Sequence, residues 1–427
     1  MKTTKPHIVK FSGGRSSGMM LMQLLRQGEL RPERGDVIVF NNTSAEHPAT
    51  YDFTRKMKEL AEHEYNIPFF WTEYQTYEDA GKHGWARHPT YRLVNALPYS
   101  DSNKAGYRSE GEVFEELMSL TGYVPNMQSR LCTQWLKIFV TNSFLSDWFA
   151  QKPGIERLGH RDDTAKMSDD DVLRIHYASR GSTPKDILLE KKAFVRTRGH
   201  VRTEVLWQDF TDSSLCFDNE SLKDSIIGRK GQLFGERAIE YVSCLGIRGD
   251  ESIRVDKIRD RIAAVKKKRS ASLFQQPPKE SILAPLVDSD ISQEDVLDFW
   301  SQQDFNLDLP DTGLFSNCVY CPLKGKRKLL AIAALELSEA TDLRGTPASI
   351  DWWVEMESKY ARDLKAEKRA ITSKKDVEYA YVGFFGAAHD LVYQQLKQQA
   401  THIAQDEEHL QAEYLEADSY ATCNCTD

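Results

Sequence analysis

The stretch Ser12-Gly13-Gly14-Arg15-Ser16-Ser17-Gly18 decides how this chain of 427 residues is interpreted. An apolar run at residues 7–11 precedes it and a second at residues 19–25 follows it, which predicts a strand, a glycine-rich turn and a helix. Such a turn directs backbone N–H groups and the positive end of a helix dipole at an anion. Gly13 and Gly14 allow close backbone approach, and the serines add hydroxyl donors. The alternative is an ordinary turn between strand and helix, since the spacing fits neither the Walker A nor the dinucleotide glycine pattern.

The first 75 residues predict an α/β fold. A β-branched run at residues 37–40 reads as a strand buried on both faces, residues 48–64 as a helix, and residues 67–71 as a third strand. This alternation predicts a doubly wound parallel sheet with helices on both faces. Ligands of such sheets bind at the carboxyl ends of the strands, where the stretch 12–18 is expected to lie.

The whole chain is predicted to divide into four parts: 1–149 as the nucleotide-binding half, 150–237 as an insertion, 238–330 as the rest of the sheet domain, and 331–427 as a helical region with an acidic tail. Residues 76–125 are polar and aromatic, and are predicted to form a long loop with a helix near 111–120. Alternation resumes at residues 238–246, with helices expected over 250–268 and 292–302.

Composition limits the class of protein. The chain is 40% hydrophobic and 28% charged, and no apolar run approaches the ~18 residues of a membrane span. No signal peptide is apparent, so a cytoplasmic location is expected. The net charge of −8 argues against nucleic-acid binding by the whole surface. Seven cysteines in such a chain favour metal binding or reactive thiols over disulfides.

Further motifs follow in order along the chain. Residues 41–50 form a polar loop after the second strand, and the sequence Arg130-Leu131-Cys132 places a thiol between cationic side chains. Gly246-Ile247-Arg248 follows a predicted strand and supplies an arginine suited to phosphate or sulfate. The last motifs are Pro285-Leu286 and the chelating pair Cys318-Val319-Tyr320-Cys321.

Taken together and in this order, the motifs over residues 7–325 resemble those of the phosphoadenosine phosphosulfate (PAPS) reductase family in its broad sense, within the PP-loop adenine-nucleotide alpha-hydrolase superfamily. That group includes sulfonucleotide reductases and the sulfur-transfer component of DNA phosphorothioation. The resemblance implies binding of ATP or a sulfonucleotide, followed by sulfur transfer to a nucleic-acid or protein acceptor, or by sulfonucleotide reduction. The implied nucleotide-binding residues are Ser12, Gly13, Gly14, Arg15, Ser16, Ser17, Gly18, Asn42, Thr43, Glu46 and Gly246, and the implied catalytic residues are Lys137, Arg248 and Arg254.

The chain departs from the family pattern at two positions. Ser16 stands where the PP-loop usually has an aspartate, and the chain ends Cys423-Asn424-Cys425-Thr426-Asp427 where the reductases carry a Glu-Cys-Gly-type motif. The first departure favours a more anionic ligand, and the second argues against the reductase chemistry itself.

The resemblance also implies an iron–sulfur cluster of the 4Fe–4S type. The implied ligands are Cys132, Cys318 and Cys321, with Cys244 as the fourth, and a structural zinc site is the alternative. Cys244 is equally interpreted as a buried strand thiol. Cys216 falls in the insertion, and Cys423 and Cys425 in the tail.

Two further hypotheses remain open. One is a regulator that binds nucleotide and cluster without turnover, favoured by the same two departures. The other is a zinc-stabilised nucleic-acid-binding module. The basic runs at residues 266–269 and 324–328 are typical of solvated helix ends, but the second directly follows the cysteine pair, where a nucleic-acid or sulfonucleotide phosphate could lie.

Overall fold

The computed structural model describes the chain in ten segments: residues 4–81, 84–150, 207–214, 231–236, 238–266, 272–316, 318–338, 346–368, 371–372 and 378–405. Most of the predicted insertion, the acidic tail, Cys216, Cys423 and Cys425 lie outside the described residues.

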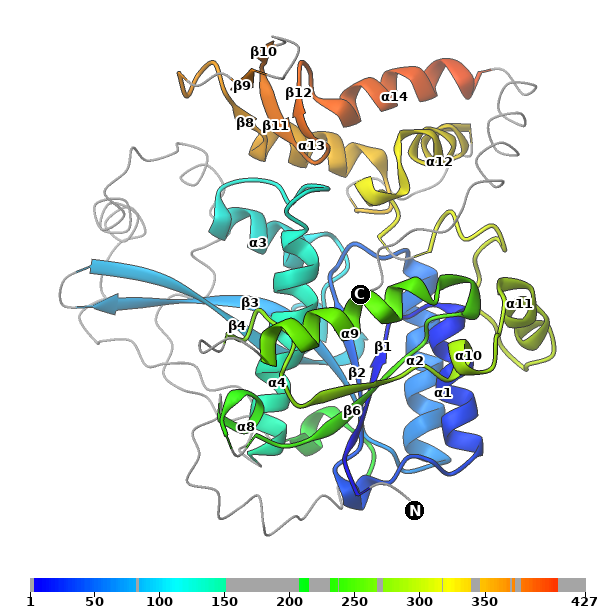
Figure 1. The fold of residues 1–427 in the computed structure, drawn as a ribbon. Helices are drawn as coiled ribbons and strands as arrows, with labels where there is room; N and C mark the ends of the chain where they lie inside the picture. Colours follow the sequence, from blue (N-terminus) through cyan, green and yellow to red (C-terminus); the bar gives the residue numbers. More distant parts are fainter. Residues whose placement is uncertain are drawn as a thin grey trace.

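A seven-stranded, mostly parallel sheet forms the centre of the described chain, in the order β5-β4-β3-β2-β1-β6-β7 (Figure 1). Its strands are β1 (His7–Phe11), β2 (Val37–Asn42), β3 (Phe69–Gly81), β4 (Gly84–Pro98), β5 (Gly106–Tyr107), β6 (Tyr241–Leu245) and β7 (Glu280–Leu283). β1 pairs in parallel with both β2 and β6, and the chain winds outward from β1 in both directions. The predicted α/β class is confirmed, with β1 and β2 at the predicted strands 7–11 and 37–40 and β6 within residues 238–246, where alternation was expected to resume.

Successive strand residues face opposite layers. Val9 and Ile38 belong to the core beneath α1 (Arg15–Arg26), α2 (Pro48–His63), α10 (Pro285–Asp288) and α11 (Gln293–Ser301). Ile8 and Val37 belong to the core beneath α3 (Glu112–Thr121), the π-helical turn η2 (Thr133–Phe139) and α4 (Val140–Phe149), while α9 (Ile253–Lys266) packs on β7 beside it. Helices therefore cover both faces, as a doubly wound sheet requires.

The prediction of a long loop over residues 76–125 is wrong in its first half. β3 continues to Gly81 and pairs antiparallel with β4, in a register that runs from Trp71↔Val94 to Gly81↔Gly84. This long hairpin projects from the sheet (Figure 1). The helix expected near 111–120 is confirmed as α3.

The C-terminal region combines helices with short strands. Its helices are α12 (Lys326–Ser338), α13 (Ile350–Tyr360) and α14 (Val392–Ile403), and its strands are β8 (Arg362–Asp363), β9 (Ile371–Thr372), β10 (Glu378–Tyr379), β11 (Tyr381–Gly383) and β12 (Gly386–Ala388). The prediction of a helical region missed these strands. Trp353 packs on Phe114 of α3, at 5.6 Å between ring centroids, so this region extends one of the two cores. Among the described helices, none has both the length and the apolar character needed to cross a membrane.

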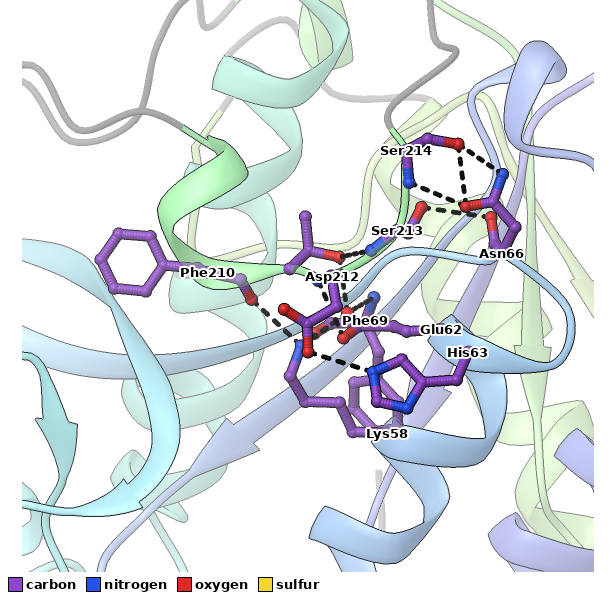
Figure 2. Close-up of polar contacts among 10 residues, drawn as sticks. Lys58, Glu62, His63, Asn66, Phe69, Phe210, Asp212, Ser213 and Ser214 are labelled. Atoms are coloured by element: carbon purple, nitrogen blue, oxygen red, sulfur yellow. Dashed lines mark hydrogen bonds and ion pairs between the residues drawn. The ribbon is translucent and has the colours of Figure 1, made fainter.

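The segment 207–214 is the longer described part of the predicted insertion, and a buried ion pair fastens it to the sheet (Figure 2). Lys58 of α2 donates from Nζ to Glu62 Oε1 at 2.5 Å, to the Phe69 carbonyl at 2.7 Å and to the Phe210 carbonyl at 3.0 Å. Glu62 in turn accepts from Thr211 Oγ1 at 2.5 Å and from the Asp212 amide at 3.2 Å. The two charges thus satisfy one another and backbone groups of two separate segments, the start of β3 and residues 207–214.

Replacing Glu62 by alanine should destabilise the protein by about 3 kcal/mol, because Lys58 would keep a buried charge without its carboxylate. Burial already lowers the pKa of Lys58, and Glu62 opposes that effect. Chemical denaturation of the Glu62→Ala variant measures the loss. Glu59→Ala, at an exposed position of the same helix, is the control, and equal stabilities of the two variants would contradict the prediction.

Candidate functional site

The point where the chain reverses direction along the sheet lies between β1 and β6. β2 and β3 follow β1 on one side, whereas β6 and β7 lie on the other. In open α/β sheets, the crevice beyond the carboxyl ends of the strands at such a reversal binds ligands. Here the loops after β1 and β6 are in close contact, since a Cβ on Gly246 would stand 2.5 Å from Ser17 Cα. The two loops therefore form one surface.

The loop after β1 ends in an open helix terminus. Gly14 is the N-cap of α1, no side chain caps the helix, and its first turn holds no acidic residue. Gly13 takes φ +79°, and a Cβ there would lie 2.6 Å from Thr50 Cγ2. Ser12 donates from Oγ to Ser17 Oγ at 3.0 Å, and Ser17 donates to the Gly14 carbonyl at 2.8 Å. These bonds fix the loop, and the helix presents its positive end to an anion.

The loop after β6 and the start of α9 each contribute an arginine to the same place. Arg248 donates from Nη1 to Ser16 Oγ at 3.4 Å, and its Nε and Nη2 contact the carboxylate of Asp250 at 2.9 and 3.0 Å. Arg254 pairs with Glu251, at 2.7 Å between Nη1 and Oε1. Both guanidinium groups are largely buried, which strengthens their field. A cavity here is lined by Ser12, Gly14, Arg15, Ser16, Ser17, Gly246, Arg248, Glu251, Arg254, Gln293, Val296, Leu297, Leu307, Asp311, Thr312, Gly313, Leu314, Ser316, Lys324 and Lys328.

Two residues of the stretch 12–18 have structural contacts instead. The Arg15 guanidinium donates from Nη2 to the carbonyls of Leu307 and Leu309 at 2.8 and 2.6 Å, and it pairs with Asp311. Arg15 therefore holds the segment that forms the far wall of the cavity. A Cβ on Gly18 would stand 2.5 Å from the Trp300 ring, so Gly18 permits close packing of α1 against α11.

The three residues predicted in the loop after β2 have different positions. Asn42 is fully buried, where its amide donates to Glu73 and to the Arg108 carbonyl and its oxygen accepts from the Ser44 amide. Thr43 donates to Glu46 Oε1 at 2.7 Å and stands 3.6 Å from Cys318 Sγ. Burial raises the pKa of Glu46. Asn42 is thus committed to the fold, while Thr43 and Glu46 lie beside the cysteines.

A second cavity lies on the α4 and α9 side of the sheet and shares Ser12 and Gly246 with the first. Its lining is Lys10, Phe11, Ser12, Asn41, Glu46, Lys137, Ile138, Thr141, Asn142, Leu245, Gly246, Ile247, Ile258, Gln276 and Ile282. Lys137 and Glu46 were predicted from the sequence. Sequence reasoning missed Asn41 and Gln276. The position of Asn41 at the end of a predicted strand was the signal available, whereas nothing in the sequence singles out Gln276.

Three of the four predicted cysteine ligands share one small apolar pocket. Cys132, Cys318 and Cys321 line it together with Phe114, Trp353 and Phe384. Burial raises the pKa of all three thiols, to about 11 for Cys321. Lys324 donates to the carbonyls of Leu314 and Val319, which fixes the turn that carries Cys318 and Cys321.

Cys244 does not join this group. Its thiol is fully buried among Val9, Met20 and Leu286, in the core beneath α1 and α2. The other three cysteines lie on the opposite face of the sheet, where Cys132 and Cys318 pack against the second core. Burial raises the pKa of Cys244 to about 12. The expectation that Cys244 faces the site is therefore wrong.

The three thiols of this pocket are the candidate ligands for a metal or a cluster. Within the described part of the chain, no three side chains of His, Cys, Asp or Glu converge closely enough to hold a metal ion. The three thiols suit a thiolate-bound metal or cluster by their chemistry and apolar surroundings, and they supply at most three ligands from one pocket.

Comparisons of the chain with protein-family models, with curated proteins and with solved structures give no match.

Proposed function

We propose that the protein is an enzyme that binds ATP or a sulfonucleotide with a PP-loop and transfers sulfur. The observation that carries this proposal is the contact between the uncapped N-terminus of α1 and Arg248 across Gly246, at the reversal point of the sheet. Backbone N–H groups, serine hydroxyls and a guanidinium meet there around one cavity, which is the donor set that a pyrophosphate or sulfate group requires.

The chemistry follows from where the charges lie. With ATP, an acceptor oxygen would attack the α-phosphorus, the bond to the β-phosphate oxygen would break, and pyrophosphate would leave with its electron pair. The helix terminus and Arg248 would stabilise that leaving charge, and Arg254 would hold the loop through Glu251. A reduced sulfur donor would then displace AMP from the activated acceptor. With a sulfonucleotide, the same site would hold the sulfate that is reduced.

The pocket lined by the three cysteines is the candidate location for the sulfur chemistry near this site. Thr43 connects the two, because it contacts both Glu46, which lines the second cavity, and Cys318. Cys132, Cys318 and Cys321 would hold an iron–sulfur cluster, which would supply a binding place for substrate sulfur. Zinc bound to the same thiols is the alternative.

Anaerobically purified protein incubated with ATP or with PAPS tests the proposal. We expect release of pyrophosphate and AMP from ATP, or of sulfite from PAPS with a thiol reductant, and about four iron and four sulfide per chain that are lost in Cys318→Ala. Nucleotide binding without any product would favour the regulatory hypothesis. Zinc in place of iron would contradict the cluster, and absence of binding by either nucleotide would contradict the proposal as a whole.

A further inference from the structure

The second cavity has apolar walls and a polar side chain, that of Gln276, which forms no hydrogen bond within the described segments. Leu245, Ile247, Ile258 and Ile282 form much of its lining, and it shares Ser12 and Gly246 with the cavity at the N-terminus of α1. Gln276 is 8% exposed and lines this cavity. Within the described segments, no residue forms a hydrogen bond with its side-chain amide. The amide is therefore available to a ligand that enters the cavity.

The segment that carries Gln276 is held firmly. Asn142 of α4 donates from Nδ2 to the carbonyls of Leu273 and Gln275, both at 2.8 Å. Phe274 stacks on Phe139 at 4.7 Å between ring centroids, and packs against Trp135 at 4.5 Å. These contacts fix the backbone on the N-terminal side of Gln276. Its amide is therefore preorganised, and binding a ligand would require little ordering of this segment.

Two of the three charged side chains that line the cavity are held by partners of their own. Lys10 pairs with Glu280 at 2.5 Å, and Glu46 accepts from Thr43 and Tyr51. A planar group held between isoleucine and leucine side chains, with a polar edge toward an amide, has the chemistry of a nucleobase. A glutamine amide satisfies both the amino group and the adjacent ring nitrogen of adenine, as it does when proteins read adenine in nucleic acids.

We propose that Gln276 recognises the adenine base of the nucleotide, with its oxygen accepting from the amino group and its nitrogen donating to a ring nitrogen. Asn142 is the positioning residue that holds the segment carrying Gln276. This inference rests on the proposed function, since it assigns the base end of the nucleotide whose phosphates bind at α1. It makes Gln276 a determinant of specificity.

Calorimetric titration with ATP, GTP and inorganic tripolyphosphate separates base recognition from phosphate binding. We expect the wild type to prefer ATP to GTP. Gln276→Leu should bind ATP about 10-fold more weakly, while its affinity for tripolyphosphate stays unchanged. Asn142→Ala should lower the ATP-to-GTP affinity ratio in the same way, an effect that general destabilisation would not produce. Gln394→Leu, at an exposed position of α14, is the matched control.

The titrations distinguish a failure of base recognition from a failure of the proposed function. If the wild type binds tripolyphosphate and ATP but Gln276→Leu keeps the full preference for ATP, base recognition by Gln276 is overturned and the proposed function stands. Equal affinity of the wild type for ATP and GTP overturns it as well. If the wild type binds neither tripolyphosphate nor any nucleotide, both proposals fail together.

Discussion

Arg248→Ala should lower the turnover of the bound nucleotide about 100-fold. The variant would lack the guanidinium that stabilises the negative charge on the leaving pyrophosphate or sulfur group. The effect has a second cause in this structure. Asp250 and Glu251 both pair with Arg248, so the substitution would leave Asp250 without its cation beside the phosphate-binding loop and Glu251 with Arg254 alone. The expected loss is therefore larger than that of one hydrogen bond.

Steady-state rates of pyrophosphate or sulfite release measure this loss. Arg248→Lys should recover part of the activity, since an ammonium restores the charge but not the fork of donors that holds Asp250. Arg259→Ala, on the exposed side of α9, is the matched control and should keep the wild-type rate. An Arg248→Ala variant with wild-type activity would remove Arg248 from the mechanism, and thermal denaturation would show whether a loss reflects unfolding.

The parts of the fold that follow local sequence patterns were predictable. β1, α1, β2 and α2 combine regular apolar spacing with glycine or proline at the boundaries, and each is found where it was expected. The β3–β4 hairpin was missed because residues 76–98 mix polar and aromatic side chains without a regular period. Its long antiparallel register depends on pairing between two segments, which a single-sequence pattern does not record.

The parts of the site that depend on distant contacts were not predictable. Arg15 stands in an anion-binding loop, yet its guanidinium is held by carbonyls almost 300 positions along the chain. Cys244 was expected to face the site because it lies two residues before Gly246 in the sequence. Successive side chains of a strand point to opposite faces of the sheet, and both faces are apolar when helices cover them. The sequence alone therefore does not tell which face a given side chain occupies. The register with Val9 places Cys244 beneath α1 and α2.

Gly246→Ala adds only one methyl group, yet we expect it to disturb the site strongly. The added Cβ would stand 2.5 Å from Ser17 Cα and 2.8 Å from the Ser17 amide nitrogen, and both are backbone atoms that no rotamer change can move. The loops after β1 and β6 must then separate. Overpacking of this kind costs about 1–3 kcal/mol of stability. Because the α1 terminus and Arg248 would no longer face one cavity, we also expect at least a 10-fold loss of tripolyphosphate affinity.

Gly18→Ala separates the loss of stability from the loss of tripolyphosphate affinity. A Cβ on Gly18 would also stand 2.5 Å from another atom, but that atom belongs to the Trp300 ring on the α11 side of the helix. Gly18→Ala should therefore lower the melting temperature while leaving tripolyphosphate affinity within about twofold of the wild type, whereas Gly246→Ala should lower both. Equal loss of affinity in the two variants would mean that the helix terminus responds to packing anywhere along α1. The close contact between the two loops would then have no special part in binding.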